Sequence, residues 1–134
     1  MNPFMMYDNI IPLLEPKDIV AVTTASSYLA LKGAIRAGFL IPIGAITTGT
    51  ATDTEVVTVE AATAEGGTEA AIAFKYRLSG ALGANTWGAV TTADTTGLAI
   101  ASTDDNKVLW IEVDPDELAA NDYTVVRVKD TTEP

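Results

Sequence analysis

The residue types that most often carry catalysis are missing from this chain or scarce in it. Its 134 residues include no histidine and no cysteine. Histidine-based catalytic triads, thiol nucleophiles, zinc–thiolate sites and disulfides are therefore excluded. With no histidine, no cysteine and no cofactor-binding loop, an enzyme is the class that the sequence favours least.

One acidic cluster has the residue types that suit a calcium ion. Asp104, Asp105 and Asn106 are consecutive, and Asp94 lies in the preceding loop. Calcium takes six or more oxygen ligands, and the aspartate-rich loop motif with its glycine is absent. Aspartate and asparagine also favour β-turns on their own. We expect a polar turn and no metal site, while cation binding by these residues stays an open alternative.

A second acidic cluster contains Asp114, Asp116 and Glu117, and glycosidases use carboxylates in pairs. The positions of these residues in the sequence also suit the start of a helix. Asp114 precedes Pro115, and aspartate followed by proline is typical of the first residues of a helix. We therefore expect one short helix near 115–120, and no catalytic residue, cofactor or metal ligand.

The two tryptophans, Trp87 and Trp110, have the side chains of a sugar-stacking platform or of a protein contact. Trp110 alternates with Leu109, Ile111 and Val113 along a predicted strand. If that triplet faces the core, Trp110 faces outward, where aromatic residues often anchor interfaces. A second buried layer inside the monomer would hide Trp110 equally well.

The net charge disfavours two classes of partner. The chain has 18 acidic and 8 basic residues, a net charge of −10, and beyond residue 50 the acids outnumber the bases by 15 to 5. Such a surface repels nucleic-acid phosphates and anionic membranes. The N-terminal residues lack the basic region of a signal peptide. We expect neither a nucleic-acid nor a membrane partner.

The elements that must position these residues are short strands joined by turns. Residues 69–78 alternate throughout between two faces, and Gly66-Gly67 predicts a hairpin before them. The predicted strands cover residues 18–25, 35–46, 54–61, 69–78, 87–92, 98–101, 107–113 and 123–129. The sequence therefore predicts an all-β fold, an antiparallel β-sandwich of seven to eight short strands with one short helix.

Residues 1–17 are predicted to form an extended N-terminal arm, because three prolines prevent a continuous helix or a central strand. The arm is apolar, so it packs either on its own domain or on another subunit. The β-sandwich domain is expected over 18–130, and residues 131–134 as a frayed tail. The predicted partner contacts are Trp110 and the apolar side chains of the arm: Phe4, Met5, Met6, Ile10, Ile11, Leu13 and Leu14.

Three segments resemble small virion proteins of tailed bacteriophages. They are Tyr76-Arg77-Leu78, then Asn85-Thr86-Trp87-Gly88-Ala89-Val90, and then Thr103-Asp104-Asp105-Asn106-Lys107 before an apolar strand. The segment Tyr123–Val128 is similar to the last strand of such proteins. The resemblance covers roughly residues 54–129, and a further strand expected after Arg127 is missing.

This resemblance implies a head decoration, or cement, protein. Such a protein is a non-enzymatic viral structural subunit that binds the assembled head and stabilises it. The implied partners are the major capsid protein and further copies of the chain, with a trimer favoured. The implied location is the outer surface of the virion, after synthesis in the bacterial host cytoplasm. The alternatives are a phage neck, tail or fibre component, or a carbohydrate-binding β-sandwich module.

Overall fold

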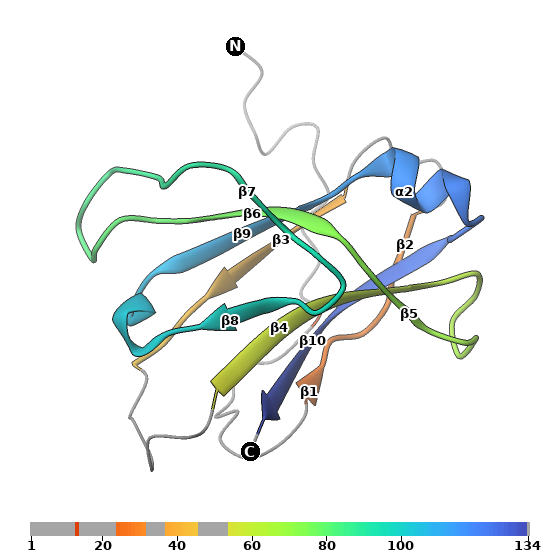
Figure 1. Ribbon diagram of the computed structural model, residues 1–134, viewed down its shortest axis with the longest axis horizontal. Coiled ribbons are helices and arrows are strands. Elements are labelled where there is room, and N and C mark those ends of the chain that lie inside the picture. The colour runs from red at the N-terminus through yellow and green to blue at the C-terminus, as the bar shows by residue number, and fades with distance from the viewer. Residues whose placement is uncertain (1–12, 14–23, 32–36, 46–53, 134) are drawn as a thin grey trace.

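The computed structural model describes residues 13, 24–31, 37–45 and 54–133. These residues form ten strands, one turn of 3-10 helix and one α-helix (Figure 1). The elements are β1 (Thr24–Ala25), β2 (Leu29–Ala30), β3 (Ala37–Pro42), β4 (Thr54–Ala62), β5 (Ala70–Ile72), β6 (Phe74–Leu78), β7 (Thr91–Ala93), β8 (Leu98–Ile100), η1 (Ser102–Asp104), β9 (Val108–Val113), α2 (Pro115–Ala120) and β10 (Val125–Glu133).

The strands form two antiparallel sheets, which confirms the predicted all-β sandwich. The first sheet has the order β1-β10-β4-β5, with β2 also paired to β10 and β8 also paired to β4. The second sheet has the order β3-β9-β6-β7. Each sheet has one face toward the common core, and this requires the alternation of apolar and polar residues that the sequence shows.

The core lies between the two sheets and draws on both of them. Its fully buried large side chains are Val59 and Val126 of the first sheet, and Phe74, Leu109 and Ile111 of the second sheet. Each side chain of this size contributes roughly 1.5–3 kcal/mol when it is removed from water. Leu118 of α2 closes part of the core.

The chain crosses from one sheet to the other in the middle of the segment 69–78. β5 pairs with β4 and β6 pairs with β9, and Ala73 separates the two strands. Ile72 and Phe74 are both buried on either side of this point. The apolar residues keep their alternation across the crossing because the face of the chain that carries Ile72 and Phe74 lies toward the core in both sheets. The predicted single strand over 69–78 is therefore two strands.

The short helix begins as predicted. The Asp114 side chain accepts a hydrogen bond from the Asp116 N–H at 3.0 Å, and Pro115 opens α2. This pairing satisfies one of the backbone donors that every helix leaves open at its first turn. The helix ends at Ala120, and Asn121 follows as its C-cap.

Several strand boundaries differ from the predictions. The described chain has ten strands where seven to eight were predicted, because β1 and β2 are separate two-residue pieces and residues 69–78 are divided. The predicted strand over 87–92 is replaced by β7, and Trp87 makes only an isolated bridge to Ser79. The predicted strand over 18–25 overlaps β1 and otherwise lies outside the described residues.

The prediction of a frayed tail is wrong for residues 131–133. β10 continues to Glu133, which lies opposite Thr54 in the ladder with β4. The Thr131 hydroxyl donates to the Val56 carbonyl oxygen at 3.3 Å. The polar composition of this segment predicts a frayed terminus, but pairing with β4 makes it part of a strand.

Only Leu13 of the predicted arm lies within the described residues. Its side chain is partly buried and packs against the core, and its carbonyl oxygen accepts a hydrogen bond from the Ser27 N–H at 3.0 Å. At this one residue the chain packs on its own domain. The other predicted arm contacts lie outside the described residues: Phe4, Met5, Met6, Ile10, Ile11 and Leu14.

One carboxylate lies on the inner side of the first sheet. Asp130 continues the alternation of Val126 and Val128 along β10 and is paired with buried Val57 of β4. Both of its carboxylate oxygens are buried without a well-formed hydrogen bond to any described residue. Burial, followed by repulsion from Glu55, raises the pKa of Asp130 to about 6.

A raised pKa means that the folded protein binds this proton more tightly than the unfolded chain does. Stability is therefore lost as pH rises from about 4 to about 6 and stays lower above that range. We expect Asp130→Asn to be more stable than the parent by about 1–2 kcal/mol at pH 8, after allowance for partial exposure of this half-buried group. At pH 4.5 the gain should fall to roughly a third of its value at pH 8. Urea denaturation at both pH values measures this difference.

The matched control is Glu65→Gln, since Glu65 is exposed in the turn between β4 and β5. It should leave stability nearly unchanged at both pH values. An effect of Asp130→Asn that is the same at pH 4.5 and pH 8 would contradict the assignment of this titration to Asp130.

Candidate interaction surface

The outer face of the second sheet carries Trp110. Leu109, Ile111 and Val113 of β9 are buried, and Trp110 lies on the opposite face of that strand, partly exposed. The conditional prediction of an outward Trp110 is confirmed. A side chain on Gly38 would come within 3.2 Å of the Trp110 ring, so the indole packs against β3 where that strand has no side chain.

A row of side chains crosses this outer face from strand to strand. In the register of the sheet Trp110 is paired with Leu40 of β3 on one side and with Arg77 of β6 on the other. Leu40 is 58% exposed. The row therefore offers an aliphatic, an aromatic and a cationic side chain next to one another at the surface.

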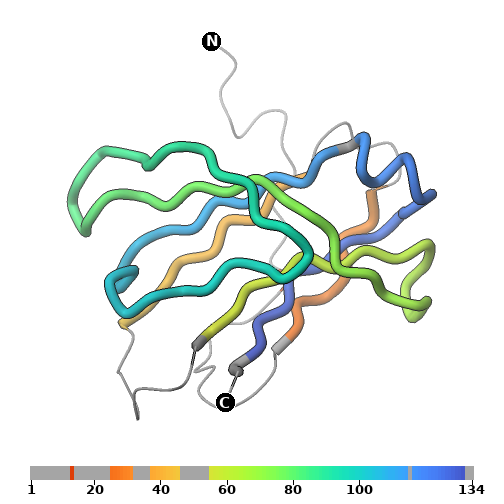
Figure 2. Tube along the Cα trace, in the orientation of Figure 1, coloured from red at the N-terminus to blue at the C-terminus, as the bar shows by residue number. Residues whose placement is uncertain are grey.

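The connection from β6 to β7 extends this surface beyond the sheet. Residues 79–90 project from one end of the molecule (Figures 1 and 2), and no charged residue occurs between Arg77 and Asp94. Leu82 is 83% exposed, Val90 64% and Trp87 44%. Together with Leu40 they are the exposed large hydrophobic side chains of the described residues. We call Leu40, Arg77, Leu82, Trp87, Val90 and Trp110 the apolar face.

The projecting segment is held by its own hydrogen bonds. The Gly80 N–H donates to the Thr86 carbonyl at 2.9 Å, and the Gly88 N–H donates to the Leu78 carbonyl at 2.8 Å. A tight turn reverses the chain at its tip, where Gly83 has φ +83°, a conformation that glycine adopts without penalty. A segment that is already ordered loses little conformational entropy on binding.

Arg77 connects the sheet to this segment. Its guanidinium carbon lies 4.9 Å from the centroid of the Trp87 ring, a cation–π arrangement. Trp110 has a different partner, since its indole N–H donates to the Glu112 carboxylate at 3.2 Å. The two tryptophans thus lie on either side of β6, and Arg77 covers one face of Trp87 instead of leaving both open for a sugar ring.

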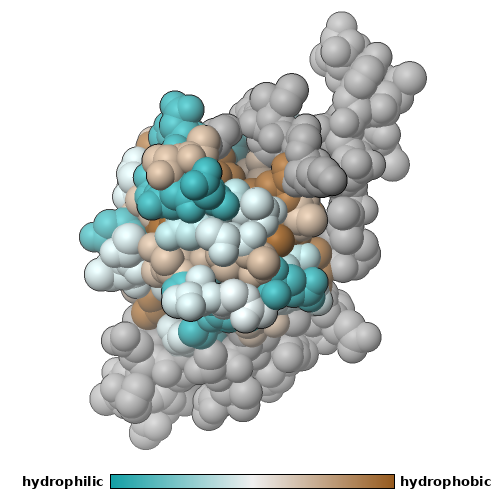
Figure 3. All heavy atoms as spheres, turned by 90° about the vertical axis from the view of Figure 1, so that its right-hand side faces the viewer, coloured by the Kyte–Doolittle hydropathy of each residue, from teal (hydrophilic) through white to brown (hydrophobic). Residues whose placement is uncertain are grey.

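The opposite end of the molecule differs in character. It carries α2 and the turn between β4 and β5, and hydrophilic and intermediate residues cover most of its coloured surface in Figure 3. Asp116, Glu117 and Asp122 are exposed there, as is Glu65 of the turn. Charge is therefore concentrated away from the projecting segment.

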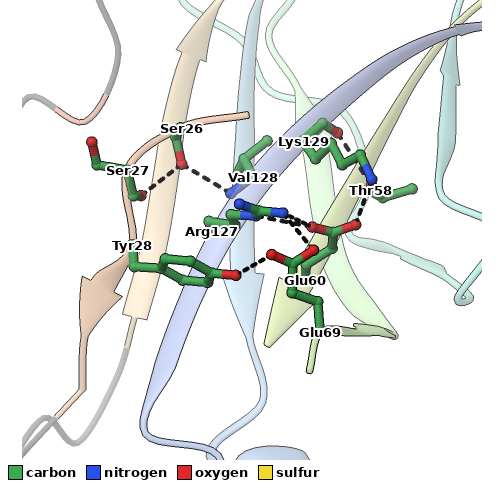
Figure 4. Close-up of polar contacts among 9 residues, drawn as sticks. All are labelled: Ser26, Ser27, Tyr28, Thr58, Glu60, Glu69, Arg127, Val128 and Lys129. Carbon is green, nitrogen blue, oxygen red and sulfur yellow. Dashed lines mark hydrogen bonds and ion pairs between the residues drawn. The ribbon is translucent and has the colours of Figure 1, made fainter. Parts of the chain in front are cut away.

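A network of charged residues covers the outer face of the first sheet, with Glu60 of β4 at its centre (Figure 4). One Glu60 carboxylate oxygen accepts hydrogen bonds from the Arg127 guanidinium at 2.7 and 2.9 Å. The other oxygen accepts from Lys129 at 2.9 Å. Burial alone would raise the pKa of Glu60, but these hydrogen bonds from Lys129 and Arg127 outweigh it, and the pKa is lowered.

The same network fastens the segment that precedes β2. Arg127 also pairs with Glu69 at 2.6 Å, and the Tyr28 hydroxyl donates to Glu69 at 2.5 Å. This hydrogen bond raises the pKa of Tyr28. The Arg127 guanidinium lies 4.8 Å from the centroid of the Tyr28 ring. Each charged group has its partner inside the chain, so the network has a structural role.

The acidic residues considered for chemistry also have structural partners. The Asp104 carboxylate accepts from the Ala101 N–H at 3.0 Å and from Lys107 at 2.9 Å. Asp94 accepts from the hydroxyl and the N–H of Thr96, which lower its pKa. In the part of the chain that the structure describes, no three acidic side chains are placed to hold a metal ion.

Of the two predicted contact residues that the structure describes, Leu13 and Trp110, Trp110 lies on the apolar face, and its neighbours there were not predicted from the sequence. Leu40 and Arg77 belong to strands far apart in the sequence, and only the register brings them beside Trp110. For Leu82 and Val90 a signal existed, because they lie in the longest uncharged stretch after residue 50.

Comparison with known protein families, with characterised proteins and with solved structures gives no match to this chain. Within the described ranges, no helix has the length and apolar character needed to cross a membrane. The candidate site therefore has to be interpreted from its own chemistry.

The Glu60 network predicts a large loss of stability when its centre is removed. Glu60→Gln keeps the shape of the side chain but leaves two partly buried cations, Arg127 and Lys129, without their shared negative charge. We expect a loss of about 2–4 kcal/mol in the free energy of unfolding, measured by chemical denaturation.

The control is Lys75→Gln. Lys75 is paired with Asp114 at 3.9 Å, and both side chains are about half exposed. Exposed pairs contribute at most about 1 kcal/mol, so the control should lie well below Glu60→Gln. Equal, small effects of the two substitutions would mean that the network does not hold the sheet together.

Proposed function

We propose that this chain is a non-enzymatic viral structural protein, a decoration subunit that binds the assembled head of a tailed bacteriophage and stabilises it. The observation that carries the proposal is the apolar face: its exposed hydrophobic side chains gather on one sheet and one ordered projecting segment of an otherwise acidic chain. The resemblance of residues 54–129 to small virion proteins supplies the identity of the partner.

The composition of the apolar face suits binding to a protein surface. Interface hot spots are enriched in tryptophan and arginine, and both occur here side by side. Burial of a large apolar side chain contributes roughly 1.5–3 kcal/mol. Leu40, Leu82 and Val90 are each more than half exposed in the monomer, so most of that free energy is still available for association.

A subunit that binds the shell and not the free capsid protein stabilises the shell by mass action. The acidic remainder of the surface would face solvent and keep unbound copies apart. We propose that several copies, as a trimer, lie over junctions between capsomers, with the N-terminal arm of residues 1–17 as a second contact. A neck, tail or fibre component would use the same face on a different partner.

The proposal predicts that a charge at the tip of the projecting segment weakens binding to heads. Leu82→Asp adds a carboxylate where the side chain is already 83% exposed, so folding should be unaffected. Cosedimentation with heads of the encoding phage that were assembled without this protein should show affinity reduced by about tenfold or more, as expected when a charge replaces an interface anchor.

The matched control is Ala64→Asp, which adds the same charge in the exposed turn between β4 and β5 at the other end of the molecule. It should bind heads like the parent. Equal binding by the parent and both variants would refute the role of the projecting segment. Binding of the parent to purified tails but not to heads would favour the neck or tail alternative.

A carbohydrate-binding module is the competing candidate, since Trp87 and Trp110 flank the same strand. A glycan array separates the two. Binding of the parent to a glycan, lost in Trp87→Ala and Trp110→Ala, would support sugar recognition and count against the decoration function. The Arg77 guanidinium over Trp87 favours protein binding, because it occupies the ring face that a sugar would stack on.

A further inference from the structure

Arg77 differs from the other basic residues that the structure describes. Four of the five form ion pairs with carboxylates of the chain itself: Lys75 with Asp114, Lys107 with Asp104, Arg127 with Glu60 and Glu69, and Lys129 with Glu60. Among the described residues Arg77 has no carboxylate at ion-pair distance, and its recorded contact is the Trp87 ring. Within the part of this acidic chain that the structure describes, Arg77 is thus the one basic side chain without a carboxylate partner, and it lies on the apolar face.

We propose that Arg77 is the specificity-determining residue of the apolar face, and that it binds the carboxylate of an aspartate or glutamate set among apolar residues on the partner protein. This inference rests on the proposed function of the same surface, and it names the chemistry of the partner's contact segment. The partner segment has an acidic side chain opposite Arg77 and apolar side chains opposite Leu40, Trp87 and Trp110.

The geometry of the stack leaves the required donors available. A guanidinium has five N–H donors in its plane. The contact with the Trp87 ring uses no carboxylate acceptor, so the guanidinium can still bind a carboxylate through two parallel N–H groups. Stacking also restricts the rotamers of Arg77, so the donors are held in place before the partner arrives.

The surroundings of Arg77 strengthen such a pair. Trp87 lies against its guanidinium and Trp110 is its neighbour across the strands. A docking segment that covers these rings excludes water, and charges attract more strongly when water is excluded. The nearby acid of the face, Glu112, is paired in register with Lys75 and accepts the Trp110 indole N–H.

Charge also explains why recognition would be selective. Everywhere else in the described chain, basic groups are neutralised by internal partners and exposed acids repel a second carboxylate. An incoming acidic side chain is therefore favoured at Arg77 and disfavoured at the acidic end that carries α2. A partner segment with lysine or arginine at this position would meet like charge and lose affinity.

Two short peptides test the inference on the full chain without any need for the natural partner. The probes are N-acetyl-Leu-Glu-Leu-amide and N-acetyl-Leu-Gln-Leu-amide, which differ only in charge. The readout is NMR, because the two tryptophans give two indole N–H signals, assigned with Trp87→Phe and Trp110→Phe. We expect the glutamate peptide to shift the Trp87 signal with an affinity about tenfold above that of the glutamine peptide.

Three variants complete the experiment. Arg77→Gln should remove the preference for the glutamate peptide, Arg77→Lys should restore it in part, and Lys75→Gln, on the same face, should retain it. Equal affinity of the parent for the two peptides, absence of binding to both, or an unchanged preference in Arg77→Gln would overturn the inference. Far-ultraviolet circular dichroism spectra that match that of the parent show that the free variants are folded.

The head-binding assay separates this inference from the proposed function. If the parent prefers the glutamate peptide but does not bind heads, the chemistry of Arg77 stands and the decoration function fails. If heads bind the parent and Arg77→Gln equally well, and the peptides are not distinguished, the decoration function stands and the role of Arg77 is refuted.

Discussion

The ladder between β4 and β10 is the interaction on which the rest of the structure depends. Nine residue pairs join these strands, from Val125 opposite Ala62 to Glu133 opposite Thr54. All other strands of the first sheet attach to one member of this pair, β5 and β8 to β4, and β1 and β2 to β10. Its inner side supplies Val59 and Val126 to the core, and its outer side carries the Glu60 network. Loss of this ladder would remove both at once.

The two outer faces of the sandwich differ in how their charged side chains are paired. On the first sheet, Arg127 and Lys129 form ion pairs with Glu60, so the charges of that face are satisfied within the chain. On the second sheet, Arg77 makes a cation–π contact with Trp87, and the Leu40 side chain is exposed to solvent. This difference gives the molecule one face whose charges are satisfied within the chain and another with exposed apolar side chains.

The sequence predicted those features that local patterns determine. Alternation located the inward residues of β9 and β4, and the Asp-Pro pair located the start of α2, because each depends on neighbouring residues alone. The crossing at Ala73 was not predictable, because the alternation is the same in one sheet or in two. The row of Leu40, Trp110 and Arg77 was not predictable either, because it depends on the register between strands that lie far apart in the sequence. The Glu60–Arg127 pair likewise joins residues 67 positions apart.

The same long separation has a consequence for synthesis. β4 leaves the ribosome about 70 residues ahead of its partner β10, a delay of roughly 4 to 14 seconds at usual elongation rates. During that time β5 covers one edge of β4 through the turn at 63–68, while the other edge is open to mispairing. Glu60 then places an unneutralised charge in the middle of the exposed strand, and a charge there opposes association with other nascent chains. When β10 pairs with β4, Arg127 and Lys129 neutralise Glu60, and the same carboxylate then becomes the centre of the ion-pair network of the folded sheet.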